Sequence, residues 1–344
     1  MKNIAGSLVT IITVLGLTAQ NLFSAPNENF KVFLCFGQSN MSGGAGVGPD
    51  AESQKSNPRI KVLAFANCSN PQRTANEWAD AFEPMHCGDG VSAMGPSYEF
   101  AKALIDSLPA TDTIGLIPCG LWGVSIEMFM KGKSNTSGNK PSMIGNNAWD
   151  WMVTKCKKAV ERGVFSGIIL HQGEANSGQQ DWPNKVKSIY DGLKSELNLT
   201  RDVPLVAGEL LNSSHNSIVA KIPQTLPYGY VASSSGLSGG GTYPSLHFNQ
   251  DGYRKMGQRM AVQMAKGLKD AAETKVKPRQ RVITNTSTSN MLQNVQIYSL
   301  NGKFVSTETN LSTARTSVKP GSIYIVSNKA TGTNAKLMIV PSGR

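Results

Sequence analysis

Histidine and cysteine are scarce in this chain, with 4 and 5 copies in 344 residues. No two cysteines form a Cys-x-x-Cys pair, so a zinc site of known spacing is not supported. The GxxxxGK[ST] pattern is also missing, which excludes a phosphate-binding P-loop of that type. Charged residues make up only 17% of the chain and hydrophobic residues 40%, a composition that excludes a coiled coil or a mostly disordered protein. The length suits one large domain or two smaller ones.

Acidic residues are almost missing from the C-terminal part of the chain. Between Lys275 and Arg344, ten lysines and arginines accompany a single acid, Glu308. The net charge of +11 therefore arises mainly in this tail, and residues 1–274 are nearly neutral. Binding to a nucleic acid duplex needs clustered cations, so we expect no nucleic acid partner for the main domain.

Long apolar runs are absent beyond the N-terminus. Ile4 to Leu17 is uncharged and follows Lys2, and small residues come after it. A run of this length is too short to span a bilayer of ~30 Å, and we expect no membrane span. The pattern predicts an export signal over residues 1–25, with a buried strand or helix as the alternative. We therefore expect a secreted protein, either extracellular or attached to the cell surface.

The cysteines fall into two groups. Cys35, Cys119 and Cys156 lie in apolar or helical sequence and are expected to be buried thiols. Cys68 and Cys87 lie in loop-like sequence, where an exported protein could join them as a disulfide.

Short apolar runs alternate with segments of helical period through residues 26–274. The predicted strands are Lys31–Phe36, Ile60–Phe65, Thr113–Cys119, Gly167–His171, Pro204–Gly208 and Tyr228–Ala232, and the predicted helices are Pro96–Leu108, Asn147–Arg162, Trp182–Leu197 and Gln250–Ala272. This alternation is typical of an α/β domain whose parallel sheet is covered on both faces. In such sheets the functional site lies beyond the carboxyl ends of the strands.

Residues 275–344 have a different character and predict a small, basic, all-β module. Its expected strands are Asn294–Leu300, Lys303–Ser306, Ser322–Ser327 and Ala335–Val340, with a hairpin turn at Asn301-Gly302. One reading of this module is that it binds acidic polysaccharide or the cell surface.

Four candidate residues follow predicted strands. Ser39 lies between Gly37 and a Gly-Gly pair, where a nucleophile would be exposed, although the segment could also be a simple glycine-rich turn. Gln172 and Glu174 follow the fourth strand and supply an amide donor and a carboxylate. Gly123 follows the third strand and could offer an unhindered backbone N–H.

Histidines are candidates for the general base. His247 precedes the last helix and could reach back over the sheet. His171, at a strand end, is expected to be structural, and His86 and His215 are expected to be surface or structural residues.

Four segments in this order resemble the SGNH hydrolase superfamily, in its carbohydrate esterase family 6 and sialate O-acetylesterase-like branch. They are FGQSNMSG at 36–43, GLIPCGLWGVSI at 115–126, HQGEAN at 171–176 and HFNQDGYRKMG at 247–257. The resemblance implies a flavodoxin-like three-layer α/β/α sandwich and serine esterase chemistry, with no metal or other cofactor.

The resemblance also implies roles for individual residues. Ser39 would be the nucleophile and His247 the general base and acid, while the oxyanion hole would combine the N–H groups of Ser39 and Gly123 with the Gln172 amide. The family usually has an aspartate where this chain has Pro244, and Asp251 should project elsewhere. Glu174 is therefore the expected third member of the triad.

The expected substrate is an acetylated polysaccharide or oligosaccharide, above all acetyl xylan. The alternatives are a sialate O-acetylesterase and a non-catalytic carbohydrate-binding protein on the same fold. Tryptophans could stack on sugars, although at least half of them should lie in the core; they are Trp78, Trp122, Trp149, Trp151 and Trp182. The tail is similar to C-terminal sorting domains of the type IX secretion pathway, which implies the secretion machinery or the cell surface as a partner.

Overall fold

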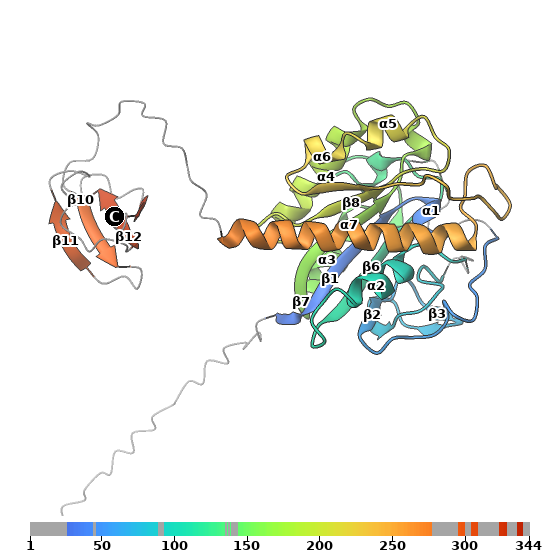
Figure 1. The fold of residues 1–344 in the computed structure, drawn as a ribbon, viewed down its shortest axis with the longest axis horizontal. Helices are drawn as coiled ribbons and strands as arrows, with labels where there is room; N and C mark the ends of the chain where they lie inside the picture. Colours follow the sequence, from blue (N-terminus) through green and yellow to red (C-terminus); the bar gives the residue numbers. More distant parts are fainter. Residues whose placement is uncertain are drawn as a thin grey trace, which may run out of the picture. The chain divides into compact units, whose positions relative to one another are not determined.

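The structure is a computed structural model (Figure 1). It describes residues 26–43, 46–88, 93–134, 136, 138 and 144–276, and four strands of the tail. The expected export signal at residues 1–25 and the turn at Asn301-Gly302 lie outside the described residues. The chain divides into two compact units, Met1–Pro278 and Arg279–Arg344.

A seven-stranded sheet forms the centre of the first unit. Its strands are β1 (Asn27–Gly37), β2 (Ile60–Leu63), β5 (Trp78–Asp80), β6 (Thr113–Gly120), β7 (Gly163–His171), β8 (Leu205–Gly208) and β9 (Gly229–Ala232), in the order β5-β2-β6-β1-β7-β8-β9. All neighbouring strands are parallel except β5, which runs antiparallel to β2 at the edge. The expected parallel sheet is thus confirmed.

The strand order refines the flavodoxin-like expectation. The five strands β6-β1-β7-β8-β9 follow the flavodoxin order 2-1-3-4-5. β2 and β5 extend this core beyond β6, although both precede β6 in the chain. A short hairpin of β3 (Cys68–Ser69) and β4 (Gln72–Arg73) lies between β2 and β5 in the sequence.

Helices cover both faces of the sheet. Because side chains alternate along a strand, Phe33 and Cys35 of β1 pack in one core with α2 (Ser97–Ile105) and α7 (Gln250–Val276). Leu34 and Phe36 pack in a second core with α3 (Trp149–Val160) and α4 (Trp182–Glu196). Figure 1 shows α2 and α7 on the near side of the sheet and α3 behind it, which makes three layers.

Shorter elements complete the first unit. They are the helices α1 (Ser39–Ser42), α5 (Asn216–Val219) and α6 (Ile222–Thr225) and two 3₁₀ turns, η1 (Ile126–Phe129) and η3 (Glu174–Asn176). A disulfide joins Cys68 to Cys87. The three other cysteines are buried free thiols. Within the described residues, no helix has the length and apolarity needed to cross a membrane.

The second unit contains a four-stranded antiparallel sheet. Its strands are β10 (Val295–Ser299), β11 (Phe304–Glu308), β12 (Ile323–Asn328) and β13 (Lys336–Ile339), in the order β11-β10-β12-β13. Each lies within or beside a run that the sequence predicted as a strand.

Candidate active site

The ends of β1 and β7 bring Ser39 to the edge of the sheet. The N–H of Gln38 donates to the His171 carbonyl at 2.9 Å. A Cβ atom at Gly37 would lie only 2.1 Å from the same oxygen, so only glycine allows this approach. The chain then turns into α1, with Ser39 as its first residue. Ser39 therefore lies at the switch point between β1 and β7, where ligands of open α/β sheets bind.

His247 contacts Ser39 across 208 residues of sequence. Its Nε2 lies 2.8 Å from Ser39 Oγ, and both side chains are buried. Burial lowers the pKa of His247, and the nearby Glu174 carboxylate opposes this effect. A neutral imidazole in hydrogen-bond contact with a serine hydroxyl is the arrangement that activates a serine nucleophile.

Glu174 approaches this pair from η3. Its Oε1 accepts a hydrogen bond of 2.7 Å from Asn40 Nδ2. Burial raises the pKa of Glu174, while the Asn40 hydrogen bond and the charge of His247 act in the opposite direction. Within the part of the chain that the structure describes, Glu174 Oε2 and His247 Nδ1 are both buried without a hydrogen-bond partner. The carboxylate thus interacts electrostatically with the imidazole, but no hydrogen bond joins them in the described part of the chain.

Asn40 connects these residues, although it was not among the predicted site residues. Besides Glu174, its Nδ2 binds the Leu246 carbonyl at 3.0 Å. Its Oδ1 accepts from the Phe248 N–H at 3.3 Å and the Tyr253 hydroxyl at 2.9 Å. Asn40 therefore holds both neighbours of His247 against the turn that carries Ser39. The only sequence signal was its position directly after Ser39.

The side-chain amide of Gln172 is part of a buried hydrogen-bond network. Trp182 Nε1–H donates to its Oε1 at 2.5 Å, and because an indole nitrogen can only donate, this contact fixes the orientation of the amide. Its Nε2 faces three acceptors, which are Gln38 Oε1 at 3.1 Å, Val124 O at 3.3 Å and Asn176 Oδ1 at 2.6 Å. An amide has only two hydrogens, so none is free. The expected oxyanion role of Gln172 is therefore corrected: its amide links neighbouring loops.

Two backbone N–H groups remain as candidate oxyanion donors. The Ser39 N–H lies in the first turn of α1, where a helix offers no internal acceptor. Gly123 is exposed with a φ of +64°. No hydrogen bond found among the described residues uses the Gly123 N–H.

Comparison with known proteins places the chain in a family. Residues 29–266 match the family described as carbohydrate esterase, sialic acid-specific acetylesterase. The chain belongs to this carbohydrate esterase family. It is 25% identical over 186 residues to a probable carbohydrate esterase of Arabidopsis thaliana, a match that spans 51% of this chain and 65% of that protein.

Solved structures share the fold. The Arabidopsis thaliana structure has a TM-score of 0.56 at 20% identity, covering 71% of this chain and all of the other. NanS has a TM-score of 0.57 at 15% identity, covering 72% of this chain and 99% of NanS. At these identities the likeness supports the three-layer fold of the esterase family.

The other histidines of the chain are buried. His171 Nε2 lies 3.1 Å from the Glu209 carbonyl, and its Nδ1 lies 3.9 Å from Glu174 Oε1. His86 accepts a hydrogen bond from the Gly120 N–H at 2.9 Å, and burial lowers its pKa to about 3. His215 accepts from the Gly178 N–H at 3.3 Å. His86 and His215 are thus buried in the fold, and the surface alternative for them is wrong.

One tryptophan lies at the esterase site. The ring of Trp122 is 5.9 Å from the His247 ring, centre to centre. Trp149 and Trp182 are fully buried, and Trp78 and Trp151 pack against the core. Three or more metal-ligating side chains do not cluster anywhere in the described residues.

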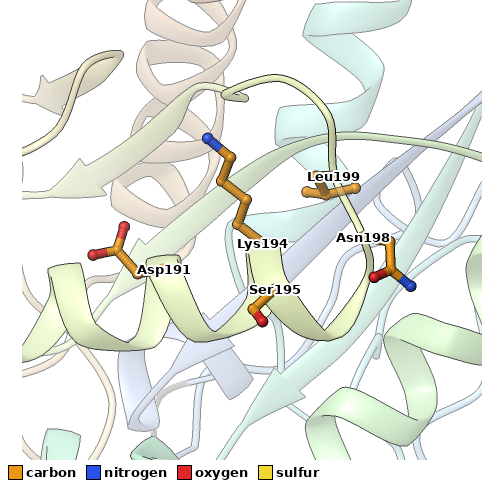
Figure 2. Close-up of a pocket in the computed structure, with 5 residues that line it drawn as sticks. All are labelled: Asp191, Lys194, Ser195, Asn198 and Leu199. Carbon is orange, nitrogen blue, oxygen red and sulfur yellow. The ribbon is translucent and has the colours of Figure 1, made fainter. Parts of the chain in front are cut away.

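A shallow hollow at the far end of α4 is remote from the site (Figure 2). It is lined by Asp191, Lys194, Ser195, Asn198 and Leu199. α4 starts at Trp182, which binds Gln172, and the first lining residue, Asp191, comes ~14 Å further along this helix. None of the candidate catalytic residues of the esterase lines it.

Proposed function

We propose that this chain is a serine esterase that removes O-acetyl groups from a neutral plant polysaccharide such as acetyl xylan. The observation that carries the proposal is the buried 2.8 Å contact between Ser39 Oγ and His247 Nε2 in a member of a carbohydrate esterase family. Burial lowers the pKa of His247, which favours the neutral imidazole that can accept a proton.

The reaction proceeds through an acetyl-enzyme. Ser39 Oγ attacks the acetyl carbonyl carbon while His247 Nε2 takes its proton. The negative oxygen accepts hydrogen bonds from the N–H groups of Ser39 and Gly123. His247 then gives the proton to the departing sugar oxygen. In the second half, water attacks the acetyl carbonyl carbon while His247 takes its proton. The bond to Ser39 Oγ then breaks, His247 gives the proton to Ser39, and acetate is released.

Glu174 is the proposed third member of the triad. His247 Nδ1 needs an acceptor when the ring becomes an imidazolium, and Glu174 Oε2 is a buried acceptor that needs a donor. The Asn40 hydrogen bond anchors the other carboxylate oxygen, Oε1.

The Glu174 carboxylate favours a neutral sugar over sialic acid, which itself carries a carboxylate. Among the described residues, no lysine or arginine forms a hydrogen bond or ion pair with Ser39, Glu174 or His247. The only carboxylate in this group, Glu174, would repel an anionic substrate.

Acetate release distinguishes the candidate functions. We expect the full chain to release acetate faster from acetylated xylan than from O-acetylated sialic acid, with Ser39→Ala as the inactive control. A faster reaction on the sialic acid ester would support the sialate O-acetylesterase alternative. Binding of either substrate without any acetate release would support the non-catalytic alternative.

We also propose that the protein is exported and that the basic tail attaches it to the secretion machinery or the cell surface. All candidate site residues precede Pro278, where the first unit ends. A chain ending at Pro278 is therefore expected to hydrolyse a small acetyl ester at the full rate but to leave the cell-surface fraction. A folded, truncated protein without activity would show that the tail contributes to the site.

A further inference from the structure

A single helical turn, Tyr243 to His247, forms one side of the site. The N–H groups of Leu246 and His247 both donate to the Tyr243 carbonyl, at 3.0 and 2.8 Å. Pro244 suits the first position of such a turn because it has no N–H to satisfy. The turn is thus a defined piece of structure that ends in the catalytic imidazole.

The inner side of this turn is held firmly. Asn40 binds the Leu246 carbonyl, and the Gly240 N–H donates to the His247 carbonyl at 3.0 Å. Any Cβ at Gly239 would lie 1.6 Å from the Pro244 carbonyl oxygen, so the backbones are in close contact there. The turn is fixed relative to Ser39 before any substrate arrives.

The outer side of the turn is exposed, and apart from Ser245 its residues are apolar. Tyr243 is 54% exposed and Leu246 is 40% exposed, and Pro244 between them is also exposed. The Tyr243 ring lies 5.8 Å from the His247 ring, and the Trp122 ring lies 5.9 Å from it. Two aromatic rings and a leucine therefore lie next to the imidazole that would protonate the leaving group.

The chemistry of the proposed reaction fixes where the sugar ring must lie. His247 Nε2 donates its proton to the leaving oxygen, which must come within ~3 Å of that nitrogen. In an O-acetylated sugar this oxygen is bonded to a ring carbon or is one carbon removed from it. The sugar ring therefore has to pack against the immediate neighbours of His247.

We propose that Tyr243, Leu246 and Trp122 form the subsite for the pyranose ring that carries the acetyl group, and that Tyr243 selects sugar esters over small alkyl esters. This inference rests on the proposed esterase function. The C–H face of a pyranose is apolar and packs well on an aromatic ring, whereas an ethyl group offers much less surface for such a contact.

The test compares an acetylated methyl xyloside with ethyl acetate. For Tyr243→Ala we expect the ratio of kcat/KM on the xyloside to kcat/KM on ethyl acetate to fall about fivefold, since one aromatic contact is worth ~1 kcal/mol. Tyr243→Phe keeps the ring and should hold the ratio within about twofold. Val262→Ala removes another exposed apolar side chain, on α7, and should leave the ratio unchanged.

Binding provides a second readout. In the Ser39→Ala background, Tyr243→Ala should weaken binding of the acetylated xyloside about fivefold or more in calorimetry. An unchanged ratio and an unchanged Kd would overturn the subsite. A wild-type chain that hydrolyses neither ester would instead refute the proposed function, even if the xyloside still binds.

Discussion

Alanine at Ser39 is expected to lower acetate release by about 10⁵-fold or more, as loss of a serine nucleophile does in other hydrolases. The hydroxyl removed is the one that contacts His247 Nε2. Its loss should leave the fold intact, because the side chain occupies the first position of α1 at the sheet edge and not the core.

Ser42 provides a matched control on the same helix. Ser42 Oγ is buried like Ser39 Oγ, and it donates only to the Ser39 carbonyl at 3.3 Å. Ser42→Ala is expected to stay within about tenfold of the wild-type rate. The two variants are compared by initial rates on a small acetyl ester and by thermal unfolding. A folded Ser39→Ala protein with near-normal turnover would contradict the serine mechanism.

Glu174→Gln is expected to lower kcat by between about 10² and 10⁴, with a much smaller change in KM. The side-chain oxygen of glutamine can still accept from Asn40, so the variant removes the negative charge and little else. Without that charge the imidazolium on His247 loses its stabilisation in the transition state. Glu209→Gln is the control, because this carboxylate follows β8 and binds Ser233 and the Ser234 N–H instead.

Restoring a carboxylate at position 244 is expected to rescue part of this loss. Pro244 is exposed in the turn that leads to His247, and residues three apart in a helical turn are neighbours. The double variant Glu174→Gln with Pro244→Asp should therefore exceed the single variant in kcat. If Glu174→Gln alone stays within about threefold of wild type, a backbone carbonyl or a water molecule supports His247, and the assignment of Glu174 is wrong.

The central strands could be predicted from the sequence, because strands that are buried on both faces are continuous apolar runs. β1 and β7 are continuous apolar runs, and the helices between strands carry apolar residues at helical spacing. The edge was harder to predict. β5 has only three residues, Trp78–Asp80, and its pairing with β2 depends on tertiary contacts. Nothing in the sequence of β2 itself indicates that this strand lies beyond β6, so its place in the sheet could not be predicted either.

The sequence predicted the main residues of the site but not the hydrogen bonds that connect them. The strand-end rule places Ser39 and Glu174 on one rim, and His247, the predicted general base, contacts Ser39 in the structure. The sequence predicted Gln172 as a free hydrogen-bond donor. Its neighbours in the sequence give no sign that the Trp182 indole and three acceptors bind its amide. Asn40 was overlooked because its four partners come from distant segments.

Active-site labelling tests the serine mechanism most directly. An organophosphonate ester reacts irreversibly with an activated serine hydroxyl, and digestion followed by mass spectrometry locates the adduct. We expect one equivalent of label, carried on Ser39, with loss of acetate release in proportion to labelling and no adduct in His247→Ala. Acetate release that persists in fully labelled protein, or a label that never reaches Ser39 in an active enzyme, would contradict the mechanism.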